Sequence, residues 1–147
     1  MSRAFWLIIA PLVLCLVASP LEAQDWQPPS REMPTMPEMD ELASNWLGPR
    51  ARWFAGVASV SGVEPSQLNA VGQGLSGTSR AQVVHFNDGP IPVVVWQDRN
   101  GDSRADIIEI YRSGGVIIQT IDADYDGQAN VVRVYDASGT LLREDRL

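Results

Sequence analysis

The chain has 147 residues, of which 45% are hydrophobic, and a formal net charge of −7. This length is enough for one domain with a modest core. Nucleic acid and anionic membranes repel an acidic surface, so we expect neither as a partner.

Residues 1–23 have the composition of a secretory signal peptide. The start is positively charged, residues 4–18 are apolar, and Ala23 is a small residue just before a polar stretch. The apolar run is shorter than the roughly 20 residues that a membrane-spanning helix needs. We therefore expect a periplasmic or secreted protein, cleaved before Gln24, with no stable membrane insertion afterwards. The single cysteine, Cys15, lies inside this run, so the mature protein would carry no disulfide.

Residues 24–37 are rich in proline and methionine, and we interpret them as an extended linker. Methionines recur here at intervals of three, at Met33, Met36 and Met39. Thioethers can bind Cu(I). The simpler interpretation is a linker that leads into a helix whose first buried residue is Met39.

Residues 38–73 are predicted to be helical, in three short segments. Apolar residues from 39 to 57 follow a helical period, and Gly48-Pro49 separates a first helix from a second over about 50–60. A shorter third turn runs to Val71. The large apolar side chains expected to face the rest of the domain are Trp46, Trp53 and Phe54.

From residue 74 onward the sequence repeats itself every 24 residues, as the two copies that begin at Asp98 and Asp122 show without a gap. An upstream copy keeps the apolar positions but has lost the acids of its loop, where it carries Gly74, Ser76 and Thr78. Each copy has the pattern of a loop, a strand, a glycine-containing turn and a second strand. Residues 74–147 are therefore predicted to form three hairpins, which make a six-stranded antiparallel meander.

The two faces of this meander differ because residues alternate faces along a strand. One face carries the polar residues His85, Glu109 and Arg133. The other is uniformly apolar, with Val84, Phe86, Ile108, Ile110, Val132 and Val134. The predicted fold class is α+β, with short N-terminal helices packed on the apolar face of the meander, so that 38–147 form one compact domain.

Two loops carry oxygen-bearing side chains at the spacing of an EF-hand. Ca²⁺ prefers six to eight oxygen ligands, which an EF-hand supplies from loop positions 1, 3, 5, 7, 9 and 12, position 7 through its backbone carbonyl. In the first loop these positions are Asp98, Asn100, Asp102, Arg104, Asp106 and Glu109. In the second loop the first five are Asp122, Asp124, Asp126, Gln128 and Asn130. Arg133 stands at position 12, so we expect the second site to be weaker unless water or Asp145 completes it.

The sequences that flank both loops favour strands, which excludes an ordinary EF-hand. The chain resembles bacterial exported proteins with EF-hand-like DxDxDGxxD repeats, in which the loop joins β-hairpins. The resemblance covers about residues 98–145 and implies Ca²⁺ binding, without implying a reaction. Ordinary turns rich in Asp, Asn and Gly are the alternative explanation.

No set of residues in the sequence suggests catalysis. His85 is the single histidine and falls on the polar face of the predicted sheet. Two hypotheses therefore stay open. The first is a non-enzymatic calcium-binding module that binds an envelope or extracellular protein or a glycan. The second is an acidic adaptor or inhibitor of an envelope protein that uses no metal.

Overall fold

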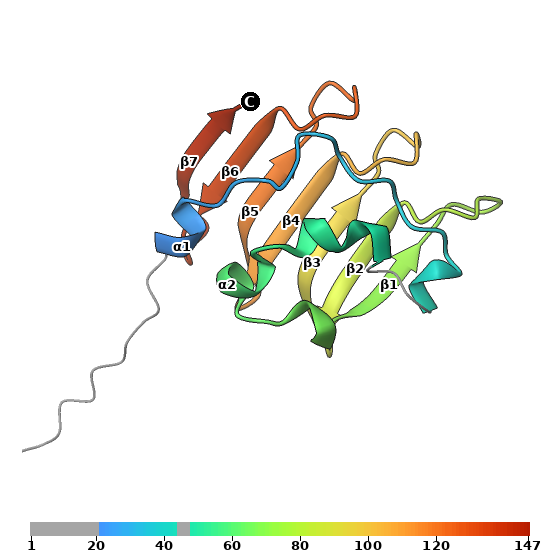
Figure 1. The fold of residues 1–147 in the computed structure, drawn as a ribbon, viewed down its shortest axis with the longest axis horizontal. Helices are drawn as coiled ribbons and strands as arrows, with labels where there is room; N and C mark the ends of the chain where they lie inside the picture. The colour runs from blue at the N-terminus through green and yellow to red at the C-terminus, as the bar shows by residue number, and fades with distance from the viewer. Residues whose placement is uncertain (1–20, 44–47) are drawn as a thin grey trace, which may run out of the picture.

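The computed structural model describes residues 21–43 and 48–147. Their main feature is one antiparallel sheet with its strands in the order β1-β2-β3-β4-β5-β6-β7, a simple meander (Figure 1). The strands are β1 (Asn69–Gln73), β2 (Val83–Asp88), β3 (Ile91–Gln97), β4 (Ile107–Arg112), β5 (Gly115–Ile121), β6 (Val131–Tyr135) and β7 (Leu141–Arg146). The predicted antiparallel meander is confirmed, but it has seven strands and not six.

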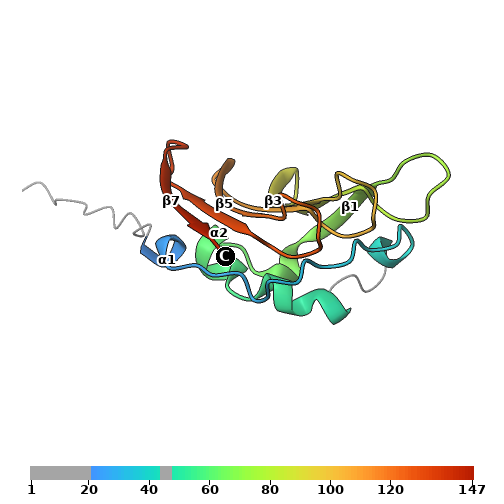
Figure 2. The same ribbon diagram turned by 90° about the horizontal axis from the view of Figure 1, so that it is seen from above.

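Short helices and an extended N-terminal segment lie together on one face of the sheet (Figure 2). Within the described ranges, no helix covers the opposite face. The helices are α1 (Leu21–Gln24), η1 (Glu41–Ala43), η2 (Gly48–Phe54), α2 (Val57–Ser61) and η3 (Pro65–Gln67), where η marks a 3₁₀-helix.

The core lies between this helical layer and the sheet. All six residues of the predicted apolar face are buried. Phe54 of η2 meets Phe86 edge-on with ring centroids 5.0 Å apart, and stacks on Trp96 at 5.8 Å. Trp53 is also buried, as predicted. Trp46 lies outside the described residues.

The prediction of three short helical segments over residues 38–73 is wrong in its boundaries and at its C-terminal end. Gly56 and Gly62, which flank α2, have left-handed φ angles of 78° and 81°, so they interrupt regular helix. Residues 69–73 form β1 and not part of a third helical turn. This strand pairs antiparallel with β2, with Ala70 opposite Phe86. An edge strand obtains its hydrogen bonds from its neighbour, and this tertiary pairing outweighs weak local preferences.

Residues 31–39, which we call the strap, cross the loop ends of the hairpins in an extended conformation (Figure 1). Met33 and Met36 are 1% and 0% exposed, whereas Met39 is 39% exposed. The strap is therefore a packed part of the domain, and the linker prediction for 24–37 is wrong. Met39 is also not the first buried methionine. The thioethers of Met33 and Met36 fill the core above the sheet.

The strap makes the same pair of backbone hydrogen bonds with three successive loops. The Met33 N–H donates to the Gly127 carbonyl at 2.9 Å, and the Ala129 N–H donates to the Arg31 carbonyl at 2.6 Å. At the next loop, the Met36 N–H donates to the Ser103 carbonyl and the Ala105 N–H donates to the Pro34 carbonyl, both at 2.9 Å. At the loop after that, the Met39 N–H donates to the Ser79 carbonyl at 2.8 Å, and the Ala81 N–H donates to the Pro37 carbonyl at 3.1 Å. Each step of three residues along the strap thus reaches the next hairpin.

The predicted signal peptide lies mostly outside the described residues. Its last residues belong to α1, in which Ala23 is buried. Within 21–43 and 48–147, no helix has the length and apolar character needed to cross a bilayer. Cleavage before Gln24 stays a prediction.

Candidate metal centre

The first acidic loop connects β3 to β4 and folds around its own carboxylates. Asp98, at position 1, accepts hydrogen bonds from the backbone N–H groups of Gly101 at 2.7 Å and Ser103 at 2.9 Å. Asp106, at position 9, accepts from the N–H groups at positions 2 and 3, at 2.6 and 3.2 Å. The loop is therefore curled into a ring whose two ends are closed by these aspartates.

The second acidic loop connects β5 to β6 in a related way. Asp122, at position 1, accepts a hydrogen bond from the N–H of Gly127 at 2.8 Å, which repeats the bond from position 6 to position 1 in the first loop. Asn130, at position 9, accepts from the N–H of Ala123 and donates to Asp124, both at 2.8 Å. The two loops therefore share one backbone design, in which position 1 and position 9 bind the loop's backbone.

Positions 4 and 6 of both loops have left-handed backbone conformations. In the first loop Gly101 has φ of 78° and Ser103 has φ of 73°; in the second, Tyr125 has φ of 61° and Gly127 has φ of 86°. An EF-hand has an invariant glycine at position 6 for its sharp turn, whereas here positions 4 and 6 both take this conformation. Each loop thus holds one non-glycine residue in a strained region.

Ser103→Gly is expected to raise the free energy of unfolding by about 0.5 to 1 kcal/mol, because it removes the left-handed strain at a small entropic cost. Gly127→Ala is the opposite case, since its new Cβ would be strained and would lie 3.2 Å from Cδ of Arg104. Urea unfolding in the presence of chelator measures both changes. A Ser103→Gly variant less stable than wild type would contradict the described loop.

Two groups of three aspartates come together in these loops. In each group, one carboxylate oxygen of every member lies within 4.8 Å of the others; the groups are Asp98, Asp102 and Asp106, and Asp122, Asp124 and Asp126. Asp106 and Asp122 are only 1% and 2% exposed. Within the described part of the chain, the Oδ1 atoms of these two aspartates are buried and have no hydrogen-bond partner. A charged oxygen in that state is costly unless a cation compensates it.

Burial also shifts the acidity of these two carboxyl groups. Desolvation raises the pKa of Asp106 above its usual value, against the lowering effect of the N–H groups of Arg99 and Asn100. Desolvation likewise raises the pKa of Asp122, against the N–H of Gly127. Neighbouring carboxylates add to both shifts. Both sites therefore favour a bound positive charge, whether a proton or a metal ion.

The backbone carbonyls at position 7 point away from the strap. In the first loop, the Ser103 carbonyl and the Ala105 N–H both face the strap. Because backbone groups alternate sides along an extended chain, the carbonyl of Arg104 lies on the loop side. Its N–H donates there to Asp102 at 2.9 Å. Gln128 has the same arrangement in the second loop, with its N–H donating to the aspartate at position 5.

In the loop without acids, the position-7 carbonyl accepts a hydrogen bond. Arg80 occupies position 7 of that loop, and the hydroxyl of Thr78, at position 5, shares its proton between the Leu75 carbonyl at 3.0 Å and the Arg80 carbonyl at 3.2 Å. Among the described residues, the carbonyls of Arg104 and Gln128 accept no hydrogen bond. The acidic loops thus leave free the carbonyl that an EF-hand uses as a ligand.

Glu109 does not join the first loop, contrary to the prediction. It lies in β4 opposite Val95 and Gln119. Its carboxylate accepts hydrogen bonds from the Tyr111 hydroxyl at 2.8 Å and from Gln119 Nε2 at 2.7 Å. Burial and the neighbouring Glu109 raise the pKa of Tyr111 to about 12, so this hydroxyl stays a donor. An EF-hand helix folds position 12 back to the loop, whereas a strand carries it about 10 Å beyond position 9.

Asp145 does not complete the second loop. It lies in β7 opposite Val132 and pairs with Arg143, whose Nε is 3.0 Å from the Asp145 carboxylate. Arg143 also donates to the carbonyls of Gln24 and Trp26. Neither loop therefore has a twelfth-position ligand, and the expected difference between them on that ground disappears.

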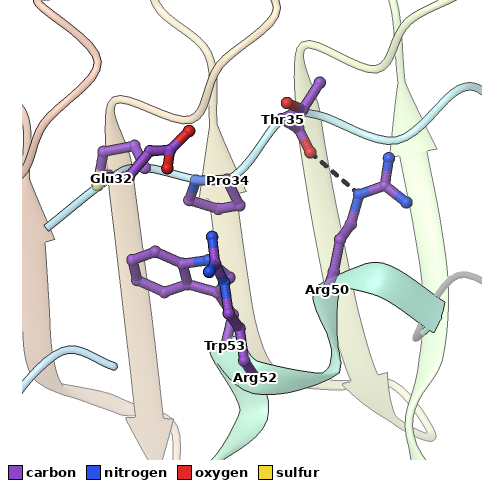
Figure 3. A pocket seen from close by; sticks show the side chains of 7 residues that line it. Glu32, Pro34, Thr35, Arg50, Arg52 and Trp53 are labelled. Atoms are coloured by element: carbon purple, nitrogen blue, oxygen red, sulfur yellow. Dashed lines mark hydrogen bonds between the residues drawn. The ribbon is translucent and has the colours of Figure 1, made fainter. Parts of the chain in front are cut away.

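Two pockets adjoin the loops and the strap. A pocket of about 200 Å³ lies between the two acidic loops, and both Asp106 and Asp122 line it. A pocket of about 260 Å³ lies between the strap and η2 (Figure 3). Beside this second pocket, Arg50 Nε donates to the carbonyl of Thr35 at 3.0 Å, as the dashed line in Figure 3 shows. Arg50 therefore fastens the strap to the helical layer.

Comparison with protein-family models, with curated proteins and with solved structures finds no match to this chain.

Proposed function

We propose that the chain is an exported, non-enzymatic calcium-binding module, built from three copies of one hairpin repeat and used in binding another macromolecule. Two of the repeats carry the cation sites. The remaining repeat has no acidic loop; it contributes strands to the sheet and hydrogen bonds to the strap.

The observation that carries this proposal is the pair of buried carboxylate oxygens without partners, Oδ1 of Asp106 and Oδ1 of Asp122. Each belongs to a cluster of three aspartates whose oxygens are close enough to share one ion. In this proposal the carbonyls of Arg104 and Gln128, which accept no hydrogen bond among the described residues, supply a further oxygen ligand at each cluster. Oxygen-only ligand sets of this kind suit a hard divalent cation.

Ca²⁺ fits these loops better than Mg²⁺. Mg²⁺ demands a near-ideal octahedron and loses its water reluctantly, whereas Ca²⁺ accepts irregular sets of six to eight oxygens. Water would have to fill the place of the bidentate glutamate, since Glu109 is engaged elsewhere. Affinities in the range of extracellular modules follow, with a Kd of about 10⁻⁴ to 10⁻³ M.

The metal-free adaptor hypothesis accounts less well for where the acids lie. A basic partner would use exposed carboxylates, which three of the six clustered aspartates supply. This hypothesis leaves unexplained why the other three, Asp98, Asp106 and Asp122, are at most 6% exposed. These three side chains face inward, where an ion can reach them and a protein surface cannot.

Thermal melts in calcium, in magnesium and in chelator test the proposal. One site that binds only the folded protein adds about 1.4 kcal/mol of stability at a ligand concentration tenfold above Kd. The Tm should therefore rise in millimolar Ca²⁺, fall in chelator, and change little with Mg²⁺. Superimposed melts in all three conditions would leave the loops as ordinary turns and favour the metal-free adaptor.

A further inference from the structure

We propose that the strap is a positioning element of both cation sites, and that calcium binding and strap docking strengthen each other. This inference rests on the proposed function, because it concerns the same two loops. It assigns a role to residues 31–39 that the loop sequences themselves do not indicate.

The strap makes hydrogen bonds to the peptide groups on both sides of position 7. In the first loop it accepts from Ala105 N–H through the Pro34 carbonyl, and it donates to the Ser103 carbonyl through Met36 N–H, both at 2.9 Å. These two bonds fix the orientation of the Arg104 peptide between them. The Arg104 carbonyl is thereby held toward the aspartate cluster.

One strap can dock on both cation sites at once, because its repeat distance matches the spacing of the hairpins. Proline restricts the strap to polyproline-like φ angles, and three residues of such a chain advance about 9.3 Å. Two sheet strands occupy about 9.5 Å. The three-residue period of Met33, Met36 and Met39 therefore matches the hairpin period, and every loop presents the same two backbone groups to it.

The loop without acids shows the arrangement in the absence of a cation site. Met39 and Ala81 make the same two strap bonds there. In that loop the position-7 carbonyl, of Arg80, accepts a hydrogen bond from the Thr78 hydroxyl, which also reaches the Leu75 carbonyl. The strap thus docks on all three loops, but only two of them have a carbonyl left to bind an ion.

The consequence is thermodynamic coupling. A cation that binds the Arg104 and Gln128 carbonyls holds the same peptide units that the strap requires. By linkage, a docked strap must then raise calcium affinity by the factor by which calcium favours docking. Loosening the strap away from the loops should weaken both sites.

Arg50 and Arg52 offer a matched pair of variants. Both extend from η2 and line the pocket in Figure 3, but between η2 and the strap as the structure describes them, Arg50 alone of the two makes a hydrogen bond, to the Thr35 carbonyl. Neither touches an aspartate of the loops in the described structure. Arg50→Ala removes this bond together with the ion pair between Arg50 and Glu41, whose carboxylate also accepts a hydrogen bond from the N–H of Glu38 in the strap. The variant should raise the Kd for Ca²⁺ about two- to tenfold, measured by calorimetry. Arg52→Ala should bind as wild type does.

Hydrogen exchange on the unmodified protein gives a readout that needs no variant. Ca²⁺ should slow exchange of the strap-bonded amides at the two cation sites, which are those of Met33, Met36, Ala105 and Ala129. The amides of Met39 and Ala81, at the loop without acids, are the internal control and should change much less.

The outcomes separate this inference from the proposed function. If calorimetry shows no Ca²⁺ binding to wild type, the proposed function fails and the coupling fails with it. If Ca²⁺ binds, but Arg50→Ala and Arg52→Ala both bind as wild type does and the four strap-bonded amides exchange at the same rate with and without Ca²⁺, the coupling is wrong and the calcium sites stand.

Discussion

Phe54→Ala is expected to lower the free energy of unfolding by about 3 to 5 kcal/mol, which is the usual cost of truncating a buried phenylalanine. Phe54 is 4% exposed and contacts the rings of both Phe86 and Trp96. It joins the helical layer to the sheet, so its loss opens a cavity between the two layers. Urea unfolding followed by circular dichroism measures the change.

Leu75→Ala is the matched control for that variant, because Leu75 is 65% exposed. Its replacement should alter stability by less than about 0.5 kcal/mol. If Phe54→Ala costs no more than Leu75→Ala, the helices do not pack on the sheet as described.

The double variant Asp106→Asn/Asp122→Asn is expected to lose the stabilisation by calcium that wild type shows. In chelator it should be more stable than wild type by about 1 to 2 kcal/mol, because two buried charges without partners are removed. In millimolar Ca²⁺ it should gain nothing, because each cluster has lost a charged ligand. Thermal melts of both proteins in both conditions check this crossing. A double variant that is less stable in chelator would contradict the buried-charge argument.

The pH dependence of this difference has a definite sign. The pKa values of Asp106 and Asp122 are raised in the folded protein, so these groups bind protons more readily when folded. Their charged forms therefore destabilise the metal-free fold above the raised pKa values, and protonation removes that cost. In chelator, the advantage of the double variant over wild type should be greatest near neutral pH and should shrink toward about pH 4. An advantage that grows as the pH falls would show that the shifts have the wrong sign.

The difference in stability between the double variant and wild type isolates the effect of Asp106 and Asp122. Other carboxyl groups act in the opposite direction, since hydrogen bonds from Ser138 lower the pKa of Asp136 and those from Arg133 lower that of Glu144. Stability from those groups is lost as the pH falls. Both proteins carry them, so their contribution cancels in the comparison.

The sequence predicted the sheet from β2 to β7 because its apolar residues alternate and its loops recur in register. β1 could not be predicted in the same way. Its sequence, Asn69 to Gln73, contains one strongly strand-forming residue, Val71, which is 58% exposed. Only its pairing with β2 makes it a strand, and pairing partners distant in sequence leave no local signal.

The sequence of the strap has a regular pattern, which an interpretation from composition alone does not use. Methionine and proline recur every three residues from Met33 to Met39, and this period fits a chain that crosses hairpins at two strands per step. The aspartates that the sequence singled out do come together in each loop, but Glu109 does not join them. The spacing of Glu109 along the chain would place it at the loop only if the segment that follows the loop were a helix, and here that segment is the strand β4.

The most direct test of the central claim is a calorimetric titration of the metal-free protein with Ca²⁺, repeated with Asp122→Asn. The two acidic loops predict two ions bound per chain with a Kd of about 10⁻⁴ to 10⁻³ M, and one ion in the variant. A titration that shows no binding of Ca²⁺ to wild type up to about ten times that Kd range, or binding that Asp122→Asn leaves unchanged, would contradict the assignment of these loops as calcium sites.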